Sequence, residues 1–307
     1  VTSKGRLVLI NSGLSEAIID VEIWSEAGIR PPKVVTLKAN SSVVQSLDSL
    51  DPGAKRIALH VAPRSGRVNA FLVDERGRGL KSLGGDMVNA SPDPSKVVVI
   101  PAIPHMKRSD KALGHTLRVI APGDVDARIS VELISTKGSF IPVGFADRAI
   151  KAGIVTEIPL NPQLAASTFA LRISSDRPIV ASVYSSTYAQ AKTDFVWSTS
   201  TAEMTEYSLA VSGLAPTLVF SGDKISISLS VLYTNKKEKK LTITGEGIAT
   251  FKVPDNARTV HFTKVSDKTV GGALISTQSG FGYLPLNPGS ELTRVLLPSA
   301  NIRVLNP

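Results

Sequence analysis

The sequence predicts an all-β chain of three tandem antiparallel β-sandwich repeats, and three observations support this prediction. Short segments alternate apolar with mainly polar residues, which is the period of a strand with one buried face. One such segment occurs three times, at 17–23, 127–133 and 227–233. In the segments between the turns, apolar residues almost never recur at the three- to four-residue spacing of an amphipathic helix. Each repeat of about 100 residues is therefore expected to be an immunoglobulin-like sandwich of six or seven short strands.

The first half of each repeat contains a strand, a turn and the repeated strand. Residues 5–28 align with residues 115–138 without a gap, so that two glycines of the first segment fall on two glycines of the second. The strand that precedes each copy ends in Asn-Ser-Gly, Ala-Pro-Gly or Ser-Gly-Asp, which are turn signals.

The second half of each repeat begins with an alternating strand, at 57–61, 169–173 and near 260–262. A polar turn and another strand follow each time, so we expect a hairpin in every copy. The basic run 236–240 lies between alternating segments, and this position predicts a solvated hairpin turn.

Composition gives the domain boundaries. We assign the repeats to residues 1–92, 93–203 and 204–290, and a C-terminal strand to 291–307. Gly, Pro, Ser and Thr are dense at 77–94 and 189–206, and we expect these two stretches to connect the repeats.

One strand is missing at the start and one is in surplus at the end. The second repeat opens with Val97–Ala102 and the third with Tyr207–Val211, but the first repeat has no equivalent. Arg294–Ser299 carries the same pattern as 97–102, an apolar triplet followed by Pro and a small residue. Two arrangements remain open. The last strand fills the vacant place in the first repeat and closes a pseudo-threefold ring, or it packs on the third repeat and the first strand was trimmed upstream.

Composition also limits the classes of function. A chain of 307 residues with 42% hydrophobic content can bury a sizeable core, and no stretch approaches the ~18 apolar residues of a spanning helix. The chain begins at Val, so we expect a mature portion that an upstream signal or anchor can precede. The absence of cysteine excludes disulfides and thiolate metal sites, and it fits export from an organism that does not rely on disulfides.

The net charge of +9 suggests anionic partners, although the basic residues are spread along the chain. Aromatic residues make up only 5% of the chain, which argues against a base-stacking nucleic-acid surface.

No constellation predicts catalysis, a metal or a cofactor. No two of the four histidines lie within eight residues of each other, and no known hydrolase, Walker or dinucleotide motif occurs. We interpret Asp124 and Asp126 as a solvated turn rather than as calcium ligands. Trp24 and Trp197 are the ligand-binding candidates. Each could be an exposed anchor for a sugar or protein, but a plug against a neighbouring domain is the favoured alternative.

Three phrases carry a family resemblance: Ala121–Asp124, Ser175–Val180 and Asp194–Trp197. With them the chain resembles an actinobacterial family of exported or membrane-anchored β-rich proteins of unknown function. The resemblance implies an extracytoplasmic protein of the cell envelope, and it supplies no catalytic residues.

We therefore expect a non-enzymatic binding, adhesion or scaffold module at the cell surface or secreted, whose partner is an envelope protein or glycan. Two alternatives remain. One is a carbohydrate- or peptidoglycan-active enzyme, in which carboxylates of two domains would meet at a junction. The other is a polyanion-binding surface protein, whose affinity would fall steeply with salt.

Overall fold

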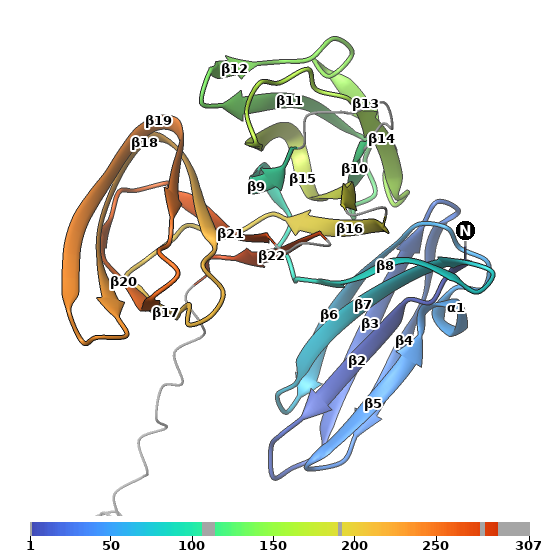
Figure 1. Ribbon diagram of the computed structural model, residues 1–307. Coiled ribbons are helices and arrows are strands. Elements are labelled where there is room, and N and C mark those ends of the chain that lie inside the picture. The colour runs from blue at the N-terminus through green and yellow to red at the C-terminus, as the bar shows by residue number, and fades with distance from the viewer. Residues whose placement is uncertain (1, 106–113, 190–191, 277–279, 288–307) are drawn as a thin grey trace, which may run out of the picture.

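The computed structural model describes residues 2–105, 114–189, 192–276 and 280–287, and within them the chain is all-β apart from one short helix (Figure 1). The predicted all-β class is confirmed. No helix in these ranges is long and apolar enough to cross a membrane. The elements are β1 (Thr2–Ser3), β2 (Arg6–Asn11), β3 (Ala17–Ser25), β4 (Gly28–Leu37), β5 (Ser41–Ser46), α1 (Leu47–Leu50), β6 (Ile57–Ser65), β7 (Asn69–Arg78), β8 (Lys81–Val88), β9 (Ser95–Pro104), β10 (His115–Ile120), β11 (Ala127–Ser135), β12 (Gly138–Phe140), β13 (Arg148–Ile150), β14 (Thr156–Leu160), β15 (Thr168–Ala189), β16 (Lys192–Thr199), β17 (Tyr207–Ala210), β18 (Thr217–Tyr233), β19 (Glu238–Lys252), β20 (Ala257–Val265), β21 (Val270–Ser276) and β22 (Phe281–Pro285).

Strands β1–β8, which we call the first unit, form two sheets. One has the order β1-β7-β2-β5 with β8 added to β7, and the other has the order β4-β3-β6. The alternating apolar residues of β2 and β3 pack between them, and Leu9, Ile19, Val21 and Ile23 have no exposed surface. The alternation read from the sequence therefore gives the correct buried face of these strands.

Strands β9–β16 form the second unit. Its residues Thr168–Ala189 make one long strand, β15, which serves two layers. The first half of β15 pairs with β9 and β11, and its second half pairs with β10 and β16. The core between these layers includes Ile129, Val131, Leu133 and Phe169, all fully buried.

Strands β17–β22 form the third unit, which is built around the long strand β18. The first half of β18 pairs with β21, its second half pairs with β20, and β19 follows it along most of its length. Lys236 lies in the turn that joins β18 to β19, with a positive φ of 64°. The basic run is thus at the exposed hairpin turn that its sequence position predicts.

The hairpin predicted in the second half of every copy is wrong. β6 and β7 lie in different sheets, β20 and β21 pair with opposite halves of β18, and β15 does not fold back at the polar residues 175–178. The register of β15 shifts between Ser174 and Ile179, where the strand leaves one layer for the other. The polar residues therefore mark a crossing between layers, which delivers apolar residues to the core from both sides.

The connecting segments predicted at 77–94 and 189–206 are also too long. Most of the first stretch is the end of β7 and the whole of β8, and the second contains the whole of β16, which has eight residues. The glycine content of the first stretch is typical of a linker, which is why the sequence predicted one there. However, Gly84 has a φ of +112°, and a Cβ there would lie 2.9 Å from the Cα of Asp194 in β16. This glycine permits close strand packing at a junction.

The three units meet where β8, β16, β21 and β22 come together (Figure 1). An apolar cluster with Ala102, Ile134, Val196, Val219 and Tyr283 joins the second unit to the third. The predicted C-terminal strand, 291–307, lies outside the described residues.

Candidate functional site

A cleft of about 1240 Å³ lies between the first and second units. One arm runs inside the first unit between β6 and β7, where Leu7, Leu59, Val61 and Leu72 line it. The other arm, which we call the junction arm, reaches the second unit. Trp24, Arg76, Arg118, Glu157 and Trp197 line the junction arm. The cleft thus has an apolar end and a charged, aromatic end.

Trp24 is 8% exposed and fills the contact between the two units. It packs with Ile120 and Val155 of the second unit, and the backbone N–H of Val155 donates to the carbonyl of Ser25 at 3.0 Å. The Nε1 of Trp24 has no hydrogen-bond acceptor among the described residues. A buried donor without an acceptor costs about 1–3 kcal/mol, so Trp24 keeps an unpaired donor at the contact between the two units, and the nitrogen itself has almost no accessible surface.

Trp197 lies on β16 and is 3% exposed. Its Nε1 donates to the Asp74 carboxylate at 3.1 Å, and its backbone N–H donates to Asp86 Oδ2 at 2.6 Å. Both acceptors belong to the first unit. Trp197 therefore ties β16 to β7 and β8 as a junction residue, and any contact between this side chain and a ligand stays a prediction.

Two guanidinium groups stack on aromatic rings around Trp197. The Cζ of Arg76 lies 4.2 Å from the centre of the Tyr184 ring and 4.9 Å from that of Phe195. The Cζ of Arg118 lies 4.6 Å from the centre of the Trp197 ring. Such contacts contribute about 0.5–2 kcal/mol each, more when desolvated.

A network of charged side chains at the junction arm links the first and second units. Arg118 on β10 faces Glu157 on β14 across the sheet, and its Nη2 donates to Glu157 Oε1 at 2.7 Å. Arg56 of the first unit donates to the other Glu157 oxygen at 3.1 Å. Burial lowers the pKa of Arg118, and the Glu157 carboxylate opposes that shift. Glu157 thus serves as the counterion of two arginines from two units.

Carboxylates of two units also lie near one another beside the junction arm, although no local sequence pattern predicted it. Asp86 on β8 has Asp74 of its own unit and Asp194 of the second unit as electrostatic neighbours. Burial, with the help of these two charges, raises the pKa of Asp86 to about 6. Asp74 also accepts from Arg76 at 3.0 Å, so the carboxylates help to fasten the junction.

The structure brings together two histidines that are ten positions apart, His105 and His115, with ring centres 5.6 Å apart. His115 Nδ1 lies 2.8 Å from Ser185 Oγ inside the second unit. Burial lowers the pKa of His115 to about 4, so it is neutral at pH 7. His115 thus has the surroundings of a packed core histidine, whereas His105 beside it is only partly buried.

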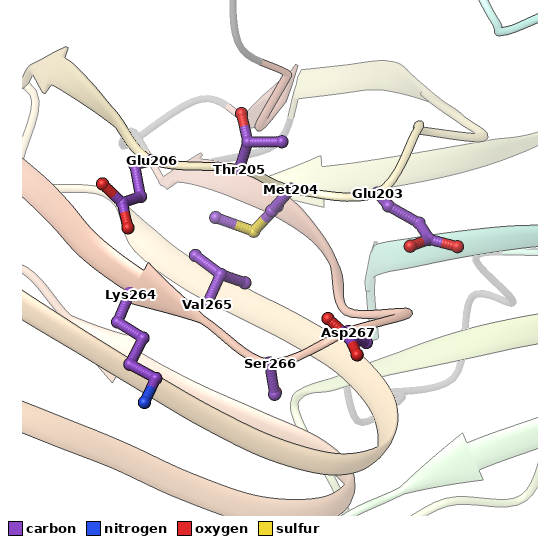
Figure 2. A pocket seen from close by; sticks show the side chains of 8 residues that line it. All are labelled: Glu203, Met204, Thr205, Glu206, Lys264, Val265, Ser266 and Asp267. Carbon is purple, nitrogen blue, oxygen red and sulfur yellow. The ribbon is translucent and has the colours of Figure 1, made fainter.

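A second, smaller pocket of about 320 Å³ lies beside the turn between β20 and β21 (Figure 2). Glu203, Glu206 and Asp267 line it, but Figure 2 shows their side chains well apart from one another. Glu203 accepts the backbone N–H of Lys268 at 3.2 Å. Within the ranges the structure describes, no group of three metal-ligating side chains occurs.

Asp124 and Asp126, which the sequence analysis weighed as calcium ligands, do not belong to a group of three metal-ligating side chains among the described residues. Asp126 accepts the backbone N–H of Ala152 at 2.9 Å, which is a structural contact between neighbouring loops.

The comparisons with known proteins give one match. No curated protein and no solved structure matches the chain. A family model does match, over residues 1–254, and its description is "Family of unknown function (DUF5719)". This range includes all of the first and second units and every residue of the junction arm named above. The chain belongs to the DUF5719 family.

Proposed function

We propose that this protein is a non-enzymatic, extracytoplasmic binding, adhesion or scaffold module of the cell envelope, with its ligand site in the junction arm of the cleft. The observation that carries the proposal is the buried indole N–H of Trp24, which lacks an acceptor in the wall of a large cleft. Trp24 lines the cleft but its Nε1 has almost no accessible surface, so a ligand oxygen would pair with it after a small shift of the indole and would then remove the cost of the unpaired donor.

The lining also indicates the chemistry of the ligand. Aromatic and guanidinium faces next to hydrogen-bonding groups suit a sugar ring or a polar peptide segment. The partner that we propose is therefore an envelope glycan or an envelope protein. The family resemblance supports the envelope location and the actinobacterial origin.

We further propose that the three units are tandem immunoglobulin-like repeats in a pseudo-threefold arrangement. Equivalent strands make equivalent pairs. β3 pairs with β4 and β6, β11 pairs with β12 and the start of β15, and the second half of β18 pairs with β19 and β20. β8, β16 and β22 each pair with the strand before them.

A second candidate is a carbohydrate- or peptidoglycan-active enzyme. One observation favours it: Asp86 has a raised pKa and lies near a carboxylate of another unit, which is a known arrangement for acid–base chemistry. Its test is the release of reducing ends from peptidoglycan by the chain and by Asp86→Asn. If the parent chain releases reducing ends and Asp86→Asn does not, the result would favour the enzyme over the binding module.

The binding test uses an array of envelope glycans, envelope protein extracts and polyanions at low and high salt. We expect salt-resistant binding that Trp24→Phe weakens about three- to tenfold, because this change removes the N–H and keeps the aromatic bulk. Phe140→Leu, at an exposed aromatic residue of the second unit, is the matched control and should bind normally.

Three results would contradict the proposal. They are no binding to any probe, equal binding by Trp24→Phe and the parent chain, or binding to every polyanion that disappears at high salt. The last result would instead favour the polyanion-binding protein.

A further inference from the structure

The edge of β6 has a strand on one side only. β6 pairs with β3, and no described residue pairs with its other edge. Ile57, Leu59 and Val61 line the cleft along this edge and are only partly buried. An open edge with half-buried apolar residues is a site for an added strand.

The equivalent strands of the other units carry the strand that β6 lacks. The first half of β15 has β11 on one edge and β9 on the other, and β20 has β18 and β17. Phe169, Leu171 and Ile173, which match Ile57, Leu59 and Val61 in the sequence, are fully buried. The matching residues of β6 are more exposed than those of β15, so an additional strand would lie along the open edge of β6.

The chain connectivity indicates which segment supplies this strand. β8 continues through residues 89–94 into β9, and β16 continues through 200–206 into β17. β22 ends at Pro285, so a connection of similar length leads to the segment 292–299. That segment includes Arg294–Ser299, whose pattern matches the β9 residues 97–102.

The segment can also reach the site. Asn89, in the lining of the cleft, donates from Nδ2 to the carbonyl of Tyr283 in β22 at 3.0 Å. β22 therefore lies next to a residue that lines the cleft. The stretch from Tyr283 to Arg294 can span up to ~36 Å when extended, whereas a nine-residue strand such as β6 is ~30 Å long.

We propose that Arg294–Ser299 adds antiparallel to the open edge of β6 and completes the first unit. This inference rests on the repeat arrangement proposed above and is independent of ligand binding at Trp24. β9 supplies the register, because Ile100 and Val98 lie opposite Leu171 and Ile173. In the first unit, Leu297 would then lie opposite Leu59 and Val295 opposite Val61, with both apolar side chains facing the apolar arm of the cleft.

The test uses a disulfide, because the chain contains no cysteine. His60 is exposed, and the same register places Leu296 opposite it. The double variant His60→Cys/Leu296→Cys should form a disulfide within one chain under mild oxidation, since Cβ atoms of opposite residues lie about 4.5–5.5 Å apart. The control His60→Cys/Val295→Cys has its second thiol on the other face of the strand and should cross-link at least about tenfold more slowly.

Hydrogen exchange of the chain without residues 292–307 gives a second readout. We expect amides of β6 to exchange at least about tenfold faster than in the full chain, while β20 keeps its protection. Cross-linking between two chains, equal rates for both cysteine pairs, or unchanged exchange of β6 after the deletion would overturn the proposal. A disulfide that forms in a chain that binds no envelope probe would uphold the strand and refute only the ligand site.

Discussion

Replacing Glu157 with glutamine is expected to weaken the junction between the first and second units. Glu157 is the counterion of Arg118 and Arg56, and the side chains of Glu157 and Arg118 are only 27% and 16% exposed. Removal of one partner of a fully buried pair costs about 3–5 kcal/mol. Because this pair keeps some exposure, we expect Glu157→Gln to reduce the free energy of unfolding by about 2 kcal/mol.

The measurement is urea unfolding followed by tryptophan fluorescence. The chain contains two tryptophans, and both line the junction arm, so the signal reports on this part of the molecule. The control is Asp147→Asn, which breaks the exposed ion pair with Arg128 and should cost no more than about 0.5 kcal/mol. If the two variants unfold at the same urea concentration, the network contributes nothing and the reasoning is refuted.

Three further predictions follow from burial and packing. Val131→Asp places a charge in the fully buried core of the second unit and should abolish its cooperative melting by circular dichroism; an unchanged melt would refute the assigned buried face. Gly84→Ala introduces a Cβ close to Asp194 at a positive φ and should lower the free energy of unfolding by about 1–3 kcal/mol, whereas Gly53→Ala, at a positive φ with open space around it, should cost less in the same urea titration. Folding raises the pKa of Asp86 from 3.8 to about 6, so its carboxyl favours folding when protonated and this stability is lost as the pH rises from about 4 through 6. Asp86→Asn should therefore stabilise the chain relative to the parent at pH 8, by up to about 3 kcal/mol, and much less at pH 4.5; an equal difference at both pH values would contradict the shift. His115 acts in the opposite direction in the parent chain, since its lowered pKa costs stability as the pH falls from 6.5 towards 4, and the comparison of two chains that both contain it cancels its effect.

The sequence predicts those parts of the fold that depend on local alternation. Ile19, Val21 and Ile23, like Ile129, Val131 and Leu133, alternate with polar residues, and all six side chains are fully buried. The period of two is a property of the strand itself, so it is visible without knowledge of any partner.

Pairing between strands is less accessible to sequence reasoning. Polar residues near Asp176 have the composition of a turn, but β15 uses them to cross between two layers while remaining one strand. Whether such a cluster reverses the chain or redirects it depends on the strands that flank it in space. The same limit applies to β8 and β16, whose glycines, serines and threonines resemble linkers but pack at the junction.

The candidate site depends almost entirely on contacts that are distant in the sequence. Trp197 and Asp74 are 123 positions apart, and Arg118 and Glu157 are 39 apart. The placement of Trp24 on the polar side of its strand was a usable signal, because a large apolar ring there needs a neighbouring surface. Asp86 and the carboxylates around it gave no such signal, since each lies in an ordinary strand.

The most direct measurement for the central proposal is a titration of the purified chain with envelope glycan fragments and envelope protein extracts, followed by tryptophan fluorescence at low and high salt. Ligand binding in the junction arm predicts a saturable spectral change at both salt concentrations, which Trp24→Phe weakens and Phe140→Leu preserves. Binding detected by another method without any change in tryptophan fluorescence would place the ligand elsewhere and contradict the site.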